Sequence, residues 1–305
     1  MYRSLPTSFI ATIATILLAM IVTSNVRGQR PRPFPSDLEL IRDIKFGTGG
    51  ERPLTMHIVR PRKPASDKLP VFVWIHGGGW RSGNHEQGIG RLIQMAREGF
   101  VSASIEYRLS GEASFPAQIH DCKCAIRYLR AHAEKYGLSP NQIAVGGASA
   151  GGHLAALLGT SGGVMKLEGT GGWPDQSSRV QAVYDLFGPT DLTRFVTTPG
   201  YRKHALPDSP ESRLIGGPVL ENKAAATAAN PIHYVSKDDP PFLIYHGSLD
   251  PTVPPNQSQL LHAALIRTGV PSTLHIIENA RHGGPEFATP EVQRIMLAFL
   301  RKSLK

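Results

Sequence analysis

A serine set among small residues is the feature that most constrains how this chain folds. The pentapeptide Gly-Ala-Ser-Ala-Gly at 147–151 follows the apolar run 143–145 and precedes a helical pattern that begins near His153. A sharp turn from strand to helix needs small neighbours, because its backbone segments pack closely and its φ/ψ angles are strained. The pentapeptide alone also fits a glycine-rich packing turn, so its meaning depends on the rest of the chain.

Short β-rich runs alternate with helical patterns from Leu38 onward, which is typical of a sheet covered by helices on both faces. We therefore predict an α/β fold with a mostly parallel, eight-stranded sheet whose first two strands form an antiparallel edge. The strands are expected near 41–46, 54–59, 71–75, 101–107, 143–145, 180–186, 242–245 and 273–277. Apolar residues follow helical spacing at 119–129, 260–265 and 292–299. With 41% hydrophobic residues, a chain of 305 residues can form one large core.

Two stretches lack this regular alternation. Residues 161–178 are rich in glycine, and residues 190–230 contain several prolines and few periodic apolar runs. Loops of this length in a compact protein are usually functional. We expect these insertions to form a small lid or a wall over the site.

A glycine-rich segment, His-Gly-Gly-Gly-Trp at 76–80, stands at the end of the apolar run 71–75. Nucleophilic attack by a serine on an ester carbonyl creates an oxyanion, which needs hydrogen-bond donors already in place. The N–H groups of Gly78, Gly79 and Ala150 are the expected donors of this oxyanion hole. A glycine-rich turn after a strand also fits a phosphate-binding loop. Trp80 is a candidate substrate-binding wall, or a cover for the core.

An acid and a base follow the serine in the order that this type of fold uses. Asp250 comes just after the expected strand 242–245, and His282 just after 273–277. We predict that His282 takes the proton of Ser149 while Asp250 fixes the tautomer of His282. Asp185 and Asp191, which flank a Gly-Pro turn after another strand, are alternative acids.

The remaining histidines point to structural roles. His76 is expected to be structural, and His120 and His153 fall on predicted helices as packing or surface residues. The spacing of the twelve histidines does not contain the H-E-x-x-H pattern of metal-binding helices. We therefore expect no metal site and no cofactor.

The first 28 residues resemble an export signal, because Arg3 precedes the apolar run 9–22 and a polar stretch follows it. We predict a signal peptide over 1–28, a single catalytic domain over 29–305, and a secreted or periplasmic protein without stable membrane association. The alternative is an uncleaved N-terminal membrane anchor, since uncharged residues continue from Ser4 to Val26.

Charge and cysteine content point to no special partner and no disulfide. The net charge of +9 is spread along the chain, which indicates solvated surface charge and no nucleic-acid partner, with attraction to an anionic polysaccharide or to the cell envelope as the alternative. Cys122 and Cys124 lie two apart in a predicted helix, so their side chains would point to nearly opposite sides. We expect both to be packing residues and not a disulfide.

These motifs together resemble the bacterial feruloyl-esterase-like α/β-hydrolases, which are close to the hormone-sensitive-lipase-like esterases. The resemblance is carried by residues 76–80, 147–153, 187–192, 246–254 and 281–283. It implies the α/β-hydrolase fold and the triad of Ser149, Asp250 and His282. It further implies an esterase acting on short acyl or aromatic acyl groups, often those on plant cell-wall sugars.

The expected function is therefore hydrolysis of a small-molecule or carbohydrate ester through an acyl-enzyme. A serine peptidase on the same fold is the nearest alternative, although such peptidases normally add a large N-terminal domain. A hydrolase-shaped binding protein that has lost catalysis is the alternative from another class. Such a protein usually lacks a triad member, and this chain has all three.

Overall fold

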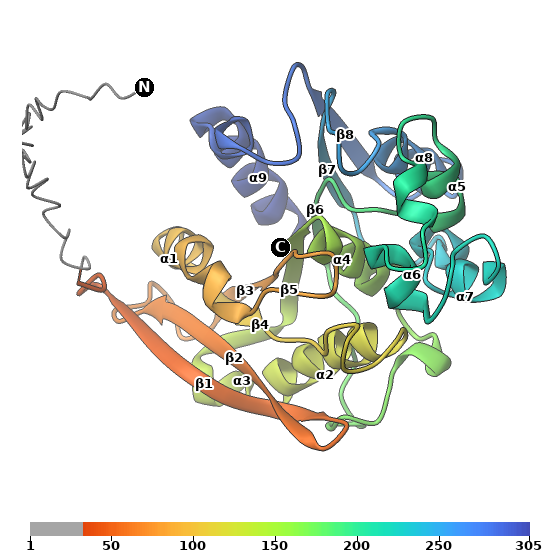
Figure 1. The fold of residues 1–305 in the computed structure, drawn as a ribbon. Coiled ribbons are helices and arrows are strands. Elements are labelled where there is room, and N and C mark those ends of the chain that lie inside the picture. The colour runs from red at the N-terminus through yellow and green to blue at the C-terminus, as the bar shows by residue number, and fades with distance from the viewer. Residues whose placement is uncertain (1–32) are drawn as a thin grey trace, which may run out of the picture. The chain divides into compact units, whose positions relative to one another are not determined.

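The computed structural model describes residues 33–305, which Figure 1 shows in colour. The predicted signal peptide over 1–28 lies outside the described residues, as does the alternative membrane anchor over 4–26. Within residues 33–305, no helix is both long enough and apolar enough to cross a bilayer.

A single eight-stranded sheet runs through the domain in the order β1-β2-β4-β3-β5-β6-β7-β8. β2 pairs antiparallel with both β1 and β4, and the other neighbours pair in parallel. The predicted α/β fold, the strand number and the antiparallel edge are therefore confirmed. The strands are β1 Leu38–Gly49, β2 Arg52–Pro61, β3 Leu69–Ile75, β4 Val101–Ile105, β5 Leu138–Ala148, β6 Ala182–Leu186, β7 Phe242–Gly247 and β8 Ser272–Ile277.

Helices cover both faces of the sheet, with α1 and α9 on one side and α2, α4 and α8 on the other (Figure 1). The three periodic patterns in the sequence correspond to α2, α8 and α9, whereas α1 was not predicted. The helices are α1 Ile89–Arg97, α2 Ala117–Ala131, α3 Ala133–Tyr136, α4 Ala150–Thr160, α5 Leu192–Thr197, α6 Pro210–Ile215, α7 Lys223–Ala228, α8 Asn256–Arg267 and α9 Pro290–Ser303. Short 3-10 helices are η1 His85–Gly88, η2 Met165–Leu167, η3 Arg202–Ala205, η4 Pro231–Tyr234 and η5 Pro285–Ala288.

The core lies on both faces of the central strands. All five residues of β4 and all six of β7 are buried, because helices cover both faces of a parallel sheet. Cys122 and Cys124 on α2 are both buried and free, as expected for packing residues.

The two irregular stretches of the sequence, 161–178 and 190–230, lie in different parts of the domain. Residues 161–178 pack against the β1–β2 hairpin, where Thr48 N donates to Gly171 O at 3.3 Å and Trp173 Nε1 donates to Phe46 O at 2.9 Å. The expectation that this stretch covers the site is therefore wrong, because its hydrogen bonds hold it at another edge of the domain.

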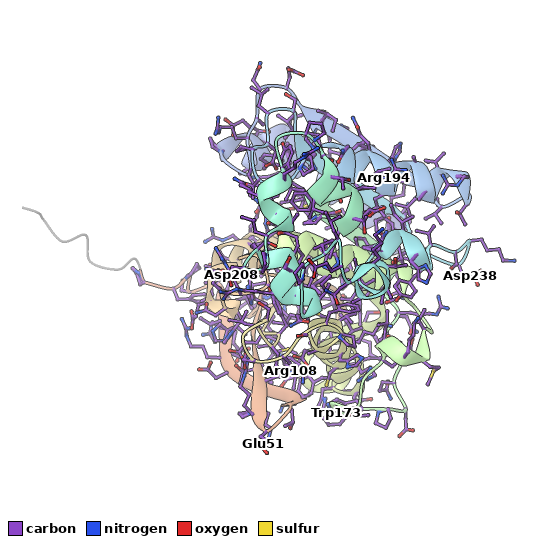
Figure 2. All side chains as sticks on the ribbon, turned by 45° about the vertical axis from the view of Figure 1, so that its right-hand side comes forward. Glu51, Arg108, Trp173, Arg194, Asp208 and Asp238 are labelled. Carbon is purple, nitrogen blue, oxygen red and sulfur yellow. The ribbon has the colours of Figure 1, made fainter. Side chains whose placement is uncertain are left out.

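Residues 190–230, here called the cap segment, contain α5, η3, α6 and α7. The sequence showed no helices here because each spans only four to six residues, too few to display a period. Figure 2 turns the cap segment toward the viewer, with Arg194 and Asp208 labelled on it. The segment contributes to the wall of the cavity described below.

Candidate active site

Ser149 occupies the turn between β5 and α4, with φ 56° and ψ −122°. Few residues other than glycine adopt a positive φ, and such strain persists only where the surroundings enforce it. Ser149 N donates to Leu186 O at 2.9 Å, and Ser149 O accepts from His153 N at 3.0 Å. The serine is thus held at the apex of the turn by hydrogen bonds to β6 and to its own helix, which begins at Ala150 and not near His153.

The glycines on either side of the serine are required by packing. A Cβ atom on Gly147 would lie 2.2 Å from the Gly151 oxygen, and one on Gly151 would lie 2.1 Å from the Ile75 oxygen. Both distances are far below van der Waals contact. The small residues of the pentapeptide therefore allow α4 to approach the ends of β3 and β5.

Three side chains from the ends of three strands meet at this turn. His282 Nε2 lies 2.9 Å from Ser149 Oγ, and His282 Nδ1 lies 2.6 Å from Asp250 Oδ2. Parallel strands place their carboxyl ends at one edge of the sheet, which explains why residues distant in sequence meet here. The structure brings together the three residues that the sequence singled out, in the relative arrangement of a serine–histidine–aspartate triad.

The carboxylate of Asp250 is buried and fully engaged. Its Oδ1 accepts hydrogen bonds from Thr252 N at 2.8 Å and Val253 N at 2.9 Å, and its Oδ2 lies 3.2 Å from His246 Nε2. Burial raises the pKa of Asp250, but the hydrogen bonds from His246 and His282 outweigh it and hold the pKa well below its usual value. Asp250 is therefore ionised at neutral pH.

His246 is a contributor that sequence reasoning missed. It is completely buried at the end of β7, with Nδ1 2.7 Å from Ser258 Oγ and Nε2 2.9 Å from Val253 O. The sequence does place it four residues before Asp250, at the end of a predicted strand. That position was the only signal available for its contact with the acid.

Asp185 and Asp191, the two alternative acids, form hydrogen bonds elsewhere and not with His282. Asp185 is completely buried and its Oδ1 accepts from Gly188 N at 2.9 Å, so it braces the turn after β6. Burial, only partly offset by that hydrogen bond, raises the pKa of Asp185 to about 6. Asp191 caps the N-terminus of α5 by accepting from Arg194 N at 3.0 Å.

The glycine-rich loop lies beside the serine. A cavity of about 460 Å³ is lined by Gly78 and Gly79 of this loop together with Ser149, Ala150 and His282. Gly78 and Gly79 have positive φ angles of 112° and 59°. Gly78 O accepts from the backbone N–H groups of Arg81 and Ser82, both at 3.2 Å, which closes the loop into a tight turn. Ala150 is the first residue of α4, where a helix leaves its N–H groups without intrahelical partners.

Trp80 lines the same cavity but is only 1% exposed. Its Nε1 donates to His153 Nδ1 at 3.2 Å, and His153 Nε2 lies 2.7 Å from the carbonyl oxygen of Ala229. Burial lowers the pKa of His153 to about 4, so the ring is neutral and its two nitrogens have fixed roles. Trp80 thus joins the glycine-rich loop, α4 and the cap segment.

Two contacts connect the cap segment to Asp250 and to the glycine-rich loop. The hydroxyl of Tyr201 donates a hydrogen bond to the carbonyl oxygen of Asp250. Pro210 packs so closely over Gly79 that a Cβ atom on this glycine would lie 3.1 Å from the proline Cβ. The cap segment is therefore positioned against both the acid and the glycine-rich loop.

One cluster of side chains outside the cavity has the composition of a metal site. Ligand atoms of Asp43, His57 and His85 lie within 4.8 Å of one another. However, His57 Nδ1 accepts from Asp43 N at 3.1 Å and His57 Nε2 lies 2.8 Å from Glu86 Oε1, so both of its nitrogens are engaged. The cluster ties the β1–β2 hairpin to η1, and we assign no metal to it.

The strained Ser149 in contact with His282, the contact of His282 with Asp250 at the ends of parallel strands, and the adjoining glycine-rich loop are features of the α/β-hydrolase class. Within this class, the BD-FAE family model matches residues 56–265, and the chain belongs to the BD-FAE family. The resemblance to feruloyl-esterase-like hydrolases that the sequence motifs indicated is thereby confirmed.

Similar proteins agree with this assignment. Esterase LipQ of Mycobacterium tuberculosis is 33% identical to this chain over 242 residues. The matched region covers 79% of this chain and 56% of the length of LipQ. The chain spans about half the length of the curated relatives it matches first, at 56%, 49% and 48%.

Two solved structures match over most of their own chains and of this one. A truncated carbohydrate esterase from gut microbiota has a TM-score of 0.79 and 30% identity, covering 87% of this chain and 96% of its own. The propionate-bound esterase Est2 of Thermogutta terrifontis has a TM-score of 0.70 and 27% identity, covering 88% and 94%.

Proposed function

We propose that this protein is a serine carboxylester hydrolase that acts on short acyl or aromatic acyl esters, including esters of carbohydrates. The observation that carries the proposal is the pair of contacts joining Ser149, His282 and Asp250 at 2.9 Å and 2.6 Å. Further support comes from the similar carbohydrate esterase and from the similar esterase with bound propionate.

Acylation begins when Ser149 Oγ attacks the ester carbonyl carbon while His282 Nε2 accepts the hydroxyl proton. The carbonyl oxygen becomes an oxyanion, which the N–H groups of Gly78, Gly79 and Ala150 stabilise. When the tetrahedral intermediate collapses, the bond to the alcohol oxygen breaks and His282 returns the proton to that oxygen. The alcohol leaves, and the acyl group remains on Ser149.

Deacylation repeats these steps with water. His282 Nε2 accepts a proton from the water, whose oxygen attacks the acyl carbon, and the bond to Ser149 Oγ then breaks as the proton returns to it. The ionised Asp250 keeps the Nδ1–H of His282 directed away from the serine and stabilises the imidazolium formed in each step. The carboxylic acid is released, and every proton is accounted for without a cofactor.

A Ser149→Ala variant tests the proposal directly. Its kcat for p-nitrophenyl acetate should fall by about 10⁴-fold or more, because the nucleophile is lost while the fold is kept. Ser66→Ala, on an exposed loop, serves as the matched control and should retain the parent rate. An inert parent, or a Ser149→Ala variant as active as the parent, would refute the proposal.

Covalent labelling separates an esterase from a hydrolase-shaped binding protein. A fluorophosphonate probe should modify the parent at Ser149, because reaction requires an activated serine beside a base. The Ser149→Ala variant should remain unlabelled. A parent that binds esters without reacting with the probe would favour the binding protein.

A further inference from the structure

A second buried histidine–carboxylate pair lines the same cavity and has no role in the proposed chemistry. His204 on η3 and Glu211 on α6 are 8% and 3% exposed, and His204 Nδ1 lies 2.9 Å from Glu211 Oε2. Both belong to the cap segment. Burying two titratable groups is unfavourable unless they are paired, so the pair requires a physical explanation.

One nitrogen of this pair is unused within the described part of the chain. His204 Nε2 is buried and has no hydrogen-bond partner among residues 33–305. Because Glu211 is the acceptor for Nδ1–H, a neutral ring carries its lone pair on Nε2. Ten buried side-chain atoms in residues 33–305 lack a hydrogen-bond partner, and among these ten His204 Nε2 is the one whose residue lines the cavity. A buried polar atom without a partner requires an explanation, and a bound ligand is one.

Contacts with neighbouring residues hold the pair in place beside the glycine-rich loop. The ring of His204 packs against that of Phe195, with the ring centroids 4.6 Å apart. The backbone carbonyl oxygen of His204 accepts a hydrogen bond from Ser209 Oγ at 2.7 Å. Pro210, which directly precedes Glu211, packs over Gly79 of the glycine-rich loop. The pair is therefore held beside the cavity that contains Ser149.

We propose that His204, oriented by Glu211, hydrogen-bonds a hydroxyl group of the ester substrate through Nε2. This inference rests on the proposed esterase function and names the substrates it prefers, namely esters bearing a free hydroxyl group. A hydroxyl both donates and accepts, so it matches the neutral ring and the imidazolium alike. A substrate carboxylate at this place would meet the charge of Glu211, and an apolar group would leave Nε2 unpaired.

The hydroxyl group has two chemical sources. It belongs either to the alcohol, as in a sugar ester, or to the acyl group, as in a phenolic acid ester. Two substrate pairs distinguish them. Methyl 2-O-acetyl-xylopyranoside is compared with tetrahydropyran-3-yl acetate, and methyl 4-hydroxycinnamate with methyl cinnamate.

The parent enzyme should prefer the hydroxylated member of one pair by about tenfold to a hundredfold in kcat/KM. This is the effect expected for a hydrogen bond to a buried histidine that is itself paired with a carboxylate. The pair that shows the preference identifies the source of the hydroxyl. Equal values within both pairs would overturn the inference. This comparison uses the unaltered protein, so it does not depend on how any variant folds.

The double variant His204→Phe/Glu211→Met tests the residues themselves. It keeps a ring against Phe195 and leaves no unpaired charge, and its preference ratio should fall to about one. His262→Phe/Ser272→Ala is the matched control, because it removes another histidine hydrogen bond, of 2.9 Å, outside the cavity. The control should keep the parent ratio. A folded double variant with the parent ratio would overturn the inference.

The two proposals fail in different ways. A parent that hydrolyses no ester and does not react with the fluorophosphonate probe overturns both. A parent that is labelled and hydrolyses all four esters without preferring a hydroxyl overturns only the assignment of His204 and Glu211.

Discussion

Asp185 and Asp250 are both buried carboxyl groups at the ends of neighbouring strands, yet burial affects them differently. Asp250 receives hydrogen bonds from two histidines and two backbone N–H groups, which together keep it ionised. Asp185 receives one backbone hydrogen bond, which does not compensate for burial, and its pKa rises to about 6. The number of donors around each buried carboxylate decides whether its pKa falls below or rises above the ordinary value.

The raised pKa of Asp185 predicts a pH-dependent gain from Asp185→Asn. The folded pKa of about 6 exceeds the unfolded value of about 3.9, so the folded state binds the proton more tightly. Stability from this group is present below pH 4 and is lost as the pH rises through 6, amounting to about 3 kcal/mol. The asparagine variant should thus gain stability over the parent at pH 8 but not at pH 4, measured by urea unfolding. The same difference at both pH values would contradict the raised pKa.

At the scale of elements, the turn between β5 and α4 depends on the absence of side chains. Gly151→Ala would place a Cβ atom 2.1 Å from the Ile75 oxygen, so α4 must move away from β3. We expect a loss of about 3 kcal/mol in the free energy of unfolding and a strongly reduced kcat, because Ser149 would shift with the helix.

The matched control for this prediction is Gly90→Ala, at a helical position in α1 where a Cβ atom meets nothing within 4 Å. That substitution should be neutral or stabilise by up to about 1 kcal/mol. Thermal melts and p-nitrophenyl acetate turnover measure both variants. Equal tolerance of alanine at the two positions would show that the packing of this turn is looser than described.

Elements with long-range regularity were predictable, and short ones were not. The central strands are short, mostly apolar runs, and the helices α2, α8 and α9 repeat apolar residues with a helical period, so both could be located from the sequence. Helices α5, α6 and α7 span six residues each, and their stability comes from packing against the rest of the domain. Their positions, and the part of the cavity wall that they form, emerged only from the structure.

For the whole molecule, the sequence reveals residues that belong to a local motif but not contacts that depend on how distant segments fold together. Ser149, Asp250 and His282 were found because each lies at a recognisable strand end in an expected order. His204 and Glu211 were missed because their pairing depends on how the cap segment folds over the glycine-rich loop. His246 was missed because a histidine at a strand end gives no sign that it contacts the acid four residues later.

The two cysteines on α2 can report how often the folded domain opens, because their thiols react only when they are exposed. They are the only cysteines of the chain, and both thiols are buried in the core. Burial raises the pKa of Cys122 well above its usual value and that of Cys124 to about 11, so reactive thiolate is scarce in the folded state. Dithionitrobenzoate should therefore modify both thiols in urea and, under native conditions, only as fast as the domain opens.

Rapid modification of the folded protein would contradict the burial of these thiols. If modification is slow, its rate measures how often a core helix is exposed, without any added label or probe. Some conditions make the domain open more often before activity is lost. Such conditions would increase the rate at which thionitrobenzoate is released.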